Sequence, residues 1–191
     1  MTMTAEAVLA LIEARQSVGQ LVEPAPSDAQ LAQAVQAALA APDHHRLRPW
    51  RFIRVQGDAR LQMGDVLVQA LQAQGETDPQ QLERVRKQPL RAPLILLAVT
   101  TCQDHPKVPV FEQLLSSGAG VQNLLLMLQA QGFAAMWRTG VLVDHPLLKS
   151  AFGLQDTDQV VGFIYIGTAA RELAERSRLS VDDFLSDWHA Q

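Results

Sequence analysis

The polar residues of this chain that could do chemistry gather in three short segments, each where a predicted helix or strand ends. They are Arg15-Gln16-Ser17, the turn from His44 to Trp50, and Trp137-Arg138-Thr139. Guanidinium groups bind phosphate through paired hydrogen bonds, hydroxyl groups suit phosphate or sugar oxygens, and histidine and tryptophan offer flat surfaces. The three segments together predict a site for an aromatic cofactor that carries a phosphate.

Each segment also has a plainer interpretation when it is taken alone. Arg15-x-Ser17 is more often a solvated helix end than a phosphate site. Trp50 and Trp137 are both readily explained by packing. A capping contact at a helix end explains His44 equally well. The prediction of a site therefore depends on the three segments occurring in one chain.

Hydrolytic and metal-dependent active sites have no counterpart in the sequence. There is no Gly-x-Ser-x-Gly elbow and no P-loop, and Gly118-Ala119-Gly120 lies inside a helical pattern. His44-His45 lacks the i, i+4 spacing of a helical zinc pair. Cys102 is the only cysteine and is interpreted as a semi-buried small residue. We therefore predict no metal site and no apparatus for nucleophilic or acid–base hydrolysis.

Composition indicates a globular chain that is neither a nucleic-acid binder nor a membrane protein. Of the 191 residues, 48% are hydrophobic and 19% charged, and the net charge is −4. The first residues do not resemble a secretory signal. The longest uncharged apolar run, residues 92–99, is far shorter than the roughly 18 residues that span a bilayer. We expect a cytoplasmic protein with no nucleic-acid or membrane partner.

Helical and strand patterns alternate along the chain and position these segments. The periodicity predicts one α+β domain over residues 1–191, because no stretch between residues 27 and 167 resembles a linker. Helices are predicted over 4–15, from Ser27 to before Pro42, over 58–73, briefly within 74–90, over 110–131, from Asp144 to Gly153, and at Ser180; strands are predicted over 51–56, 93–100, 133–137 and 160–167.

The longest predicted helix is unusual because its segment 124–128 is apolar on every side. A single amphipathic face does not explain this pattern, which is typical of a helix at the centre of a large core or at a subunit interface. Gly118 and Gly120 would allow another element to approach that helix closely.

In this order and at these distances, the three segments resemble the nitroreductase family of flavin enzymes, over about residues 7–170. Arg15-Gln16-Ser17 matches the family's Arg-Arg-Ser, and Ala41-Pro-Asp leading to Pro49-Trp50 matches its second motif. Gln131-Gly-Phe133 followed by Trp137 matches its later motif, and Val161–Gly167 its late core strand. Asp43-His44, Lys107-Val-Pro109 and Trp137-Arg138 are similar to a short subgroup, the compact NAD(P)H nitroreductases.

The resemblance implies a fold, an assembly and a site. The fold would have a central, mainly antiparallel sheet flanked by helices, in an intertwined homodimer with FMN in two pockets at the interface. Arg15, Gln16 and Ser17 would hold phosphate and ribityl, Trp137, Arg138 and Thr139 would line the same pocket, and Ala40 and His44 would come from the second subunit. The nicotinamide dinucleotide would bind at a segment made of Met127, Leu128, Gln129, Ala130, Gln131 and Gly132.

The implied activity is an FMN-dependent NAD(P)H oxidoreductase. In a ping-pong cycle, hydride would pass from nicotinamide through flavin N5 to an electron-poor small-molecule acceptor, such as a nitroaromatic or a quinone. Flavin carries this chemistry, so no catalytic residue is predicted; Arg138 is the candidate cation near flavin N1 and O2. A flavin-binding storage or sensor protein without turnover, and another flavin reaction on the same scaffold, are the alternatives.

The chain departs from the family pattern in its cations. Gln16, Gln20 and Ala40 stand where relatives offer arginine or another cation, whereas Arg46 and Arg48 stand in a turn where neutral residues are usual. One hypothesis is that Arg46 or Arg48 replaces a lost phosphate contact.

Overall fold

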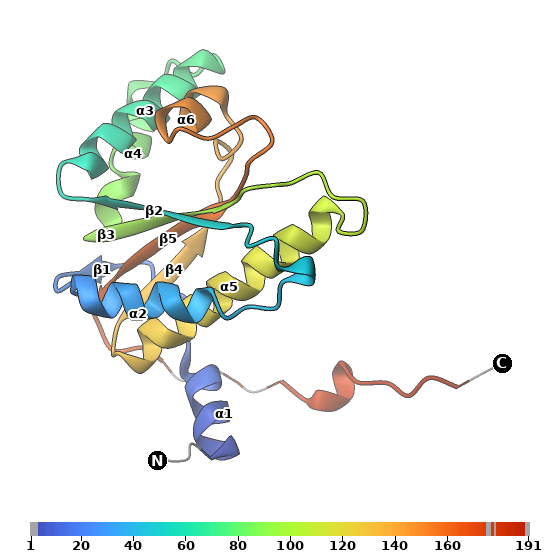
Figure 1. The fold of residues 1–191 in the computed structure, drawn as a ribbon. Coiled ribbons are helices and arrows are strands. Elements are labelled where there is room, and N and C mark those ends of the chain that lie inside the picture. The colour runs from blue at the N-terminus through green and yellow to red at the C-terminus, as the bar shows by residue number, and fades with distance from the viewer. Residues whose placement is uncertain (1–3, 175–176, 178, 190–191) are drawn as a thin grey trace.

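The computed structural model describes residues 4–174, 177 and 179–189, and its centre is a five-stranded antiparallel sheet (Figure 1). The strand order is β1-β5-β3-β2, with β4 paired to β5 beside this path. This confirms the predicted α+β class with a mainly antiparallel sheet. The strands are β1 Leu21–Val22, β2 Trp50–Gln56, β3 Leu94–Thr100, β4 Ala134–Arg138 and β5 Gln159–Ala169.

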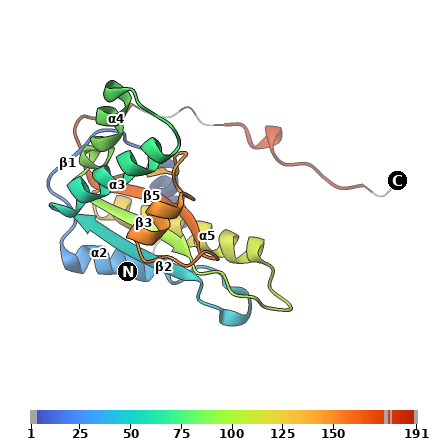
Figure 2. The ribbon, with the colours of Figure 1, turned by 90° about the horizontal axis from the view of Figure 1, so that it is seen from above.

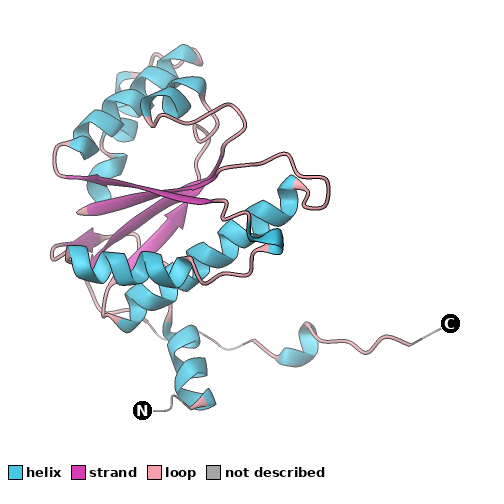
Figure 3. Ribbon diagram, in the orientation of Figure 1, coloured by secondary structure: helices cyan, strands magenta, loops and turns pink. Residues whose placement is uncertain are grey.

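Helices cover both faces of the sheet (Figure 3). α3, α4 and α6 lie on one face, and α2 and α5 on the other, as Figure 1 shows. The α-helices are α1 Ala5–Ala14, α2 Asp28–Ala38, α3 Ala59–Ala73, α4 Pro79–Arg86, α5 Val110–Ala130 and α6 Pro146–Ala151; the short 3-10 helices are η1 His44–Arg46, η2 Gln88–Arg91 and η3 Val181–Asp183.

Two separate hydrophobic clusters fill the space between the sheet and its helices. All seven residues of β3 are buried, and they alternate between the clusters because successive strand side chains point to opposite faces. Ile95 and Leu97 face α3 and α6, whereas Leu94 and Leu96 face α2 and α5. The prediction of a strand buried on both faces is therefore confirmed.

The apolar segment of α5 is explained mainly by burial within a single chain. Leu124, Leu125 and Leu128 are buried between the sheet and α2, and Leu126 and Met127 are half-buried. The close approach predicted at Gly120 is present, since an added Cβ there would lie 3.1 Å from the Ala38 carbonyl oxygen of α2.

Most predicted elements are present, with small corrections. The two-residue β1 was not predicted, because a strand of that length has no detectable periodicity. The cap of α6 is His145, not Asp144: its Nδ1 accepts a hydrogen bond from the Leu147 amide at 3.3 Å. The helix predicted at Ser180 is a single 3-10 turn. Ser27 caps α2 as predicted, with a full capping box to Gln30.

The two ends of the described chain lie outside this layered body. α1 has no buried residue, although one side of it is apolar. The C-terminal segment runs away from the sheet and helices (Figure 2). Both features leave large apolar side chains on the surface of a single protomer.

Candidate functional site

The third predicted segment lies on β4 and is shaped by an irregularity in β5. The register between β3 and β5 shifts where Ala98 pairs with Gly162 but Val99 pairs with Val160, so Val161 is the extra residue of a bulge. The Trp137 indole donates a hydrogen bond to the Val161 carbonyl oxygen at 3.0 Å. The bulge therefore provides the acceptor that fixes the end of β4.

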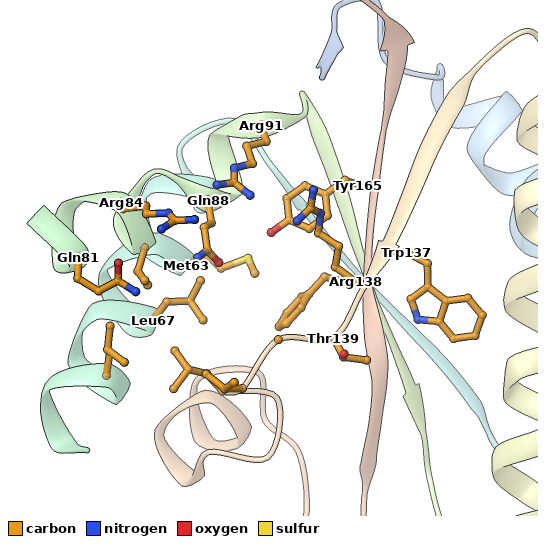
Figure 4. A pocket seen from close by; sticks show the side chains of 16 residues that line it. Met63, Leu67, Gln81, Arg84, Gln88, Arg91, Trp137, Arg138, Thr139 and Tyr165 are labelled. Carbon is orange, nitrogen blue, oxygen red and sulfur yellow. The ribbon is translucent and has the colours of Figure 1, made fainter. Parts of the chain in front are cut away.

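Glycine is required beside this contact. Gly162 has a φ of +151°, and an added Cβ would overlap the Trp137 indole and lie 2.7 Å from the Arg138 carbonyl oxygen. Trp137 and Arg138 are neighbours in a strand, so their side chains point to opposite faces. Figure 4 shows Trp137 on the side of α5, and Arg138 on the side of α3 and α4.

A cavity of about 570 Å³ lies on the Arg138 side of the sheet, within the usual size range of small-molecule sites. Trp137, Arg138 and Thr139 all contribute to its lining, so the structure brings the third segment to one place. Figure 4 shows it between α3 and α4 and the strands. The remaining lining residues are Met63, Leu67, Leu71, Gln81, Arg84, Val85, Gln88, Arg91, Gly140, Val141, Leu142, Phe163 and Tyr165.

The cavity combines apolar walls with positive charge. Arg84, Arg91 and Arg138 line it, and its lining contains no aspartate, glutamate or lysine. Burial raises the pKa of the Tyr165 phenol, and the positive charges of Arg138 and Arg91 oppose part of that shift. Tyr165 is therefore a neutral hydrogen-bond donor at neutral pH, placed beside two cations.

The first predicted segment lies next to this cavity without lining it. The Val18 amide donates to the Ala135 carbonyl oxygen of β4 at 3.1 Å, which holds the end of the segment along β4. A Cβ at Gly19 would lie 3.7 Å from an Arg138 guanidinium nitrogen. The Gln16 amide donates to the Ala174 carbonyl oxygen at 2.8 Å, so this side chain already has a partner in the C-terminal segment.

The turn that holds the second segment does not line the cavity of the same protomer. His44 Nδ1 lies 2.7 Å from Glu112 Oε2 at the start of α5, and Ala40 follows α2. The Trp50 indole donates to Ser116 Oγ at 3.1 Å, as its packing interpretation suggests. Within one protomer the structure therefore separates Ala40 and His44 from Arg138.

A strained but well-supported backbone forms this turn. His45, Arg46 and Arg48 have φ values of 59°, 57° and 51°, in the left-handed region that few side chains adopt. The Asp43 carboxylate accepts hydrogen bonds from the Leu47 amide at 3.2 Å and the Arg48 amide at 2.7 Å. Neither Arg46 nor Arg48 lines the cavity, so the hypothesis that one of them contacts phosphate stays a prediction that requires another subunit.

The segment Met127–Gly132 lies at the C-terminal end of α5, away from the cavity lining. Leu128 is fully buried, and the Gln131 amide nitrogen donates to the Gln30 carbonyl oxygen at 3.1 Å and to Gln33 Oε1 at 3.0 Å. Gly132 has a φ of +83° and ends the helix, as the sequence indicates. These contacts fix the end of α5 against α2, and the nicotinamide role of this segment stays a prediction.

Sequence reasoning missed the helical wall of the cavity. Arg84, Gln88 and Arg91 come from a polar stretch that we interpreted only as an excursion with a short helix. Arg84 lies on α4, whereas Gln88 and Arg91 lie on the separate 3-10 helix η2, so no single helical periodicity marked these residues as one wall. Tyr165 was hidden in a strand pattern that indicated only core.

Comparison with known proteins assigns the family. The model of the nitroreductase family matches residues 12–168. The chain is 38% identical over 175 residues to the Escherichia coli (strain K12) protein named "Putative NAD(P)H nitroreductase YdjA", covering 92% of this chain and 94% of that protein. A Haemophilus influenzae protein named "Putative NAD(P)H nitroreductase" is 34% identical over 181 residues, covering 93% and 97%. The chain belongs to the nitroreductase family.

Solved structures confirm the fold. A nitroreductase-like family protein from Bacillus cereus superimposes with a TM-score of 0.83 at 20% identity, covering all of both chains. A Desulfovibrio desulfuricans protein named "putative nitroreductase", solved in complex with FMN, has a TM-score of 0.72 at 22% identity and covers 98% of this chain and 100% of that one. The predicted nitroreductase-like fold is therefore correct.

The described residues include neither a membrane-spanning helix nor a metal-binding cluster. None of the described helices is long and apolar enough to cross a membrane. No group of three or more histidine, cysteine or acidic side chains in this part of the chain is arranged to hold a metal ion.

Proposed function

We propose that this protein is an FMN-dependent NAD(P)H oxidoreductase that reduces an electron-poor acceptor, such as a nitroaromatic or a quinone, in a ping-pong cycle. The observation that carries the proposal is the cavity in which Arg138, Thr139 and Tyr165 line a space with apolar walls. A flat aromatic cofactor with polar edges requires that combination of surfaces. When it is bound, FMN supplies the redox chemistry by accepting and releasing a hydride.

The residues of the cavity suit that cofactor. Met63, Leu67 and Phe163 offer apolar surface, while the Arg138 guanidinium and the neutral Tyr165 phenol offer donors. A cation and a donor beside one edge of the ring favour negative charge there. Arg138 would bind and orient that edge, and the apolar walls would exclude water. We propose that Arg15 and Ser17, in the segment that runs along β4, hold the phosphate.

The names of the relatives support a nicotinamide dinucleotide as the reductant. Proteins at 38% and 34% identity carry the name "Putative NAD(P)H nitroreductase", and a structure of the same fold contains FMN. The same space would receive first the reductant and then the acceptor.

An anaerobic titration tests this function. Purified protein should show the spectrum of bound flavin, bleach with NADH or NADPH, and recover its colour when a quinone is added. Arg138→Gln should lose FMN affinity, whereas Arg86→Gln, whose side chain pairs with Asp65 outside the cavity, should not. A colourless protein that cannot be reconstituted with FMN would sink the proposal. Colour that persists with both nicotinamides would favour a storage or sensor protein.

We further propose that the working unit is an intertwined homodimer. Large apolar side chains stand exposed on α1, at the start of α5 and on the C-terminal segment, including Leu9 at 55%, Leu115 at 66% and Trp188 at 85% exposed. Apolar surface of this extent on a monomer is uncommon, and a second copy would bury it. The same assembly would let Ala40 and His44 reach the partner's cavity.

A subunit-mixing experiment tests whether the two subunits share each pocket. Arg138→Gln and His44→Ala homodimers should both bind FMN weakly. A heterodimer of the two variants, isolated with two different affinity tags, would contain one pocket in which both residues are intact. It should therefore bind one FMN per dimer with the wild-type affinity. If both residues acted within one subunit, no pocket would be intact, and affinity would stay low.

A further inference from the structure

The helical wall of the cavity carries positive charge that nothing in the described part of the chain neutralises. Arg84 on α4 and Arg91 on η2 line the cavity, and neither forms an ion pair with a described residue. In Figure 4 Arg84 lies on the α4 side, across the cavity from Arg138, and Arg91 lies on the same side as Arg84 at the end nearer Tyr165. The protein as a whole has a net charge of −4, so this local excess of cations is not a general property of its surface.

Other cations of the same helical region form ion pairs with carboxylates. Arg86 Nε lies 3.0 Å from Asp65 Oδ1, and Lys87 Nζ lies 3.0 Å from Glu83 Oε1. These cations are thus paired with carboxylates outside the cavity. Arg84 and Arg91, the two arginines of this helical region that line the cavity, have no carboxylate partner among the described residues, and the Gln88 amide lies between them in sequence.

The role that we assign to these two arginines rests on the proposed function. Arg138 is assigned to the ring edge of the cofactor, and its phosphate to the segment Arg15–Ser17 on the other side of β4. The guanidinium groups of Arg84 and Arg91 then remain on the helical wall of the cavity. We propose that Arg84 and Arg91 bind an anionic group, a carboxylate, on the electron acceptor. The preferred acceptors are therefore electron-poor aromatic compounds that carry a negatively charged substituent.

Guanidinium groups suit this role because they form paired, charge-assisted hydrogen bonds with carboxylates. Hydrogen bonds to charged groups contribute enough to change an equilibrium constant roughly 10- to 100-fold. Wild-type protein should therefore have a kcat/KM for 4-nitrobenzoate at least about tenfold above that for the isosteric neutral 4-nitrobenzamide. Added salt should reduce this ratio, since screening weakens exposed charge interactions.

Three variants and one unreactive ligand test the proposal. In Arg84→Gln, and more so in Arg84→Gln combined with Arg91→Gln, the kcat/KM ratio of nitrobenzoate to nitrobenzamide should fall toward unity. Arg86→Gln is the matched control from the same helix and should keep the wild-type ratio. Benzoate, which has no nitro group to reduce, should bind the oxidised protein by calorimetry and lose affinity in the same two variants. Melting temperature and flavin content establish that each variant is folded.

Three results would overturn the proposal. The wild-type protein could show no preference for the carboxylate, or Arg86→Gln could lower the ratio as much as Arg84→Gln. The substitutions could instead change the preference for NADPH over NADH and leave the acceptor ratio intact, which would assign the arginines to the reductant. Failure of the underlying function is distinguishable, because protein without flavin is recognised before any acceptor is added.

Discussion

Gly162→Ala is the perturbation that most directly tests how the fold positions the site. An added Cβ would overlap the Trp137 indole and lie 2.7 Å from the Arg138 carbonyl oxygen, so β4 must shift. Overpacking costs about 1–3 kcal/mol, the displaced indole hydrogen bond about 1 kcal/mol, and the positive φ, in a region that essentially only glycine adopts, about 1–2 kcal/mol. The free energy of unfolding should therefore fall by about 3–6 kcal/mol, a large part of the about 5–15 kcal/mol typical of a domain.

Urea unfolding followed by circular dichroism measures this change. At a slope of about 2 kcal/mol per molar, the midpoint should fall by about 1.5 M or more. Gly57→Ala is the matched control, because Gly57 has a φ of +59° and nothing within 4 Å of an added Cβ. It should lose only the backbone term of about 1–2 kcal/mol. Both variants are compared at one protein concentration, since association would contribute to stability.

The reasoning would be refuted if Gly162→Ala were no less stable than Gly57→Ala. A double variant locates the cause. If the clash is with the indole, Trp137→Leu should cost less in the Gly162→Ala background than in the wild type, giving a coupling energy of about 1 kcal/mol or more. Additive effects would place the strain elsewhere. Because Arg138 follows Trp137, Gly162→Ala should also weaken FMN binding.

The remaining predictions concern single groups. Ser27→Ala should lower the free energy of unfolding by about 0.5–2 kcal/mol because it removes the cap of α2, and Ser27→Asp should retain most of it; equal losses in thermal or urea unfolding would contradict this. Burial, and secondarily the charge of Asp158, raises the pKa of the Cys102 thiol, so iodoacetamide should alkylate it at pH 8 more slowly than a cysteine peptide, and equal rates would be inconsistent with that environment. Burial also raises the pKa of Tyr165 above its ordinary value of 10.0, so its contribution to stability is complete below pH 10 and is lost as the pH rises further. Tyr165→Phe should therefore flatten the decline of melting temperature above about pH 10, and parallel profiles of variant and wild type would exclude a contribution from this phenol.

The sequence by itself determined most elements of the fold and two of the three polar segments near the cavity. Periodicity located the long α5, the fully buried β3 and the capped start of α2, because these depend on local spacing and burial. The motifs around Arg15 and Trp137 could be recognised because each is contiguous in the chain. Both segments lie along or on β4, and their role in binding a cofactor stays a prediction.

Only the tertiary structure decided what faces the cavity. Arg84 and Arg138 are 54 positions apart in sequence, and no local pattern states that a helix and a strand end will place them around one space. Strand alternation put Trp137 and Arg138 on opposite faces, but which face is hollow depends on how α3 and α4 pack against the sheet. The bulge at Val161 depends likewise on pairing with β3 and on the indole across it. These features follow from long-range packing, which has no counterpart in local spacing.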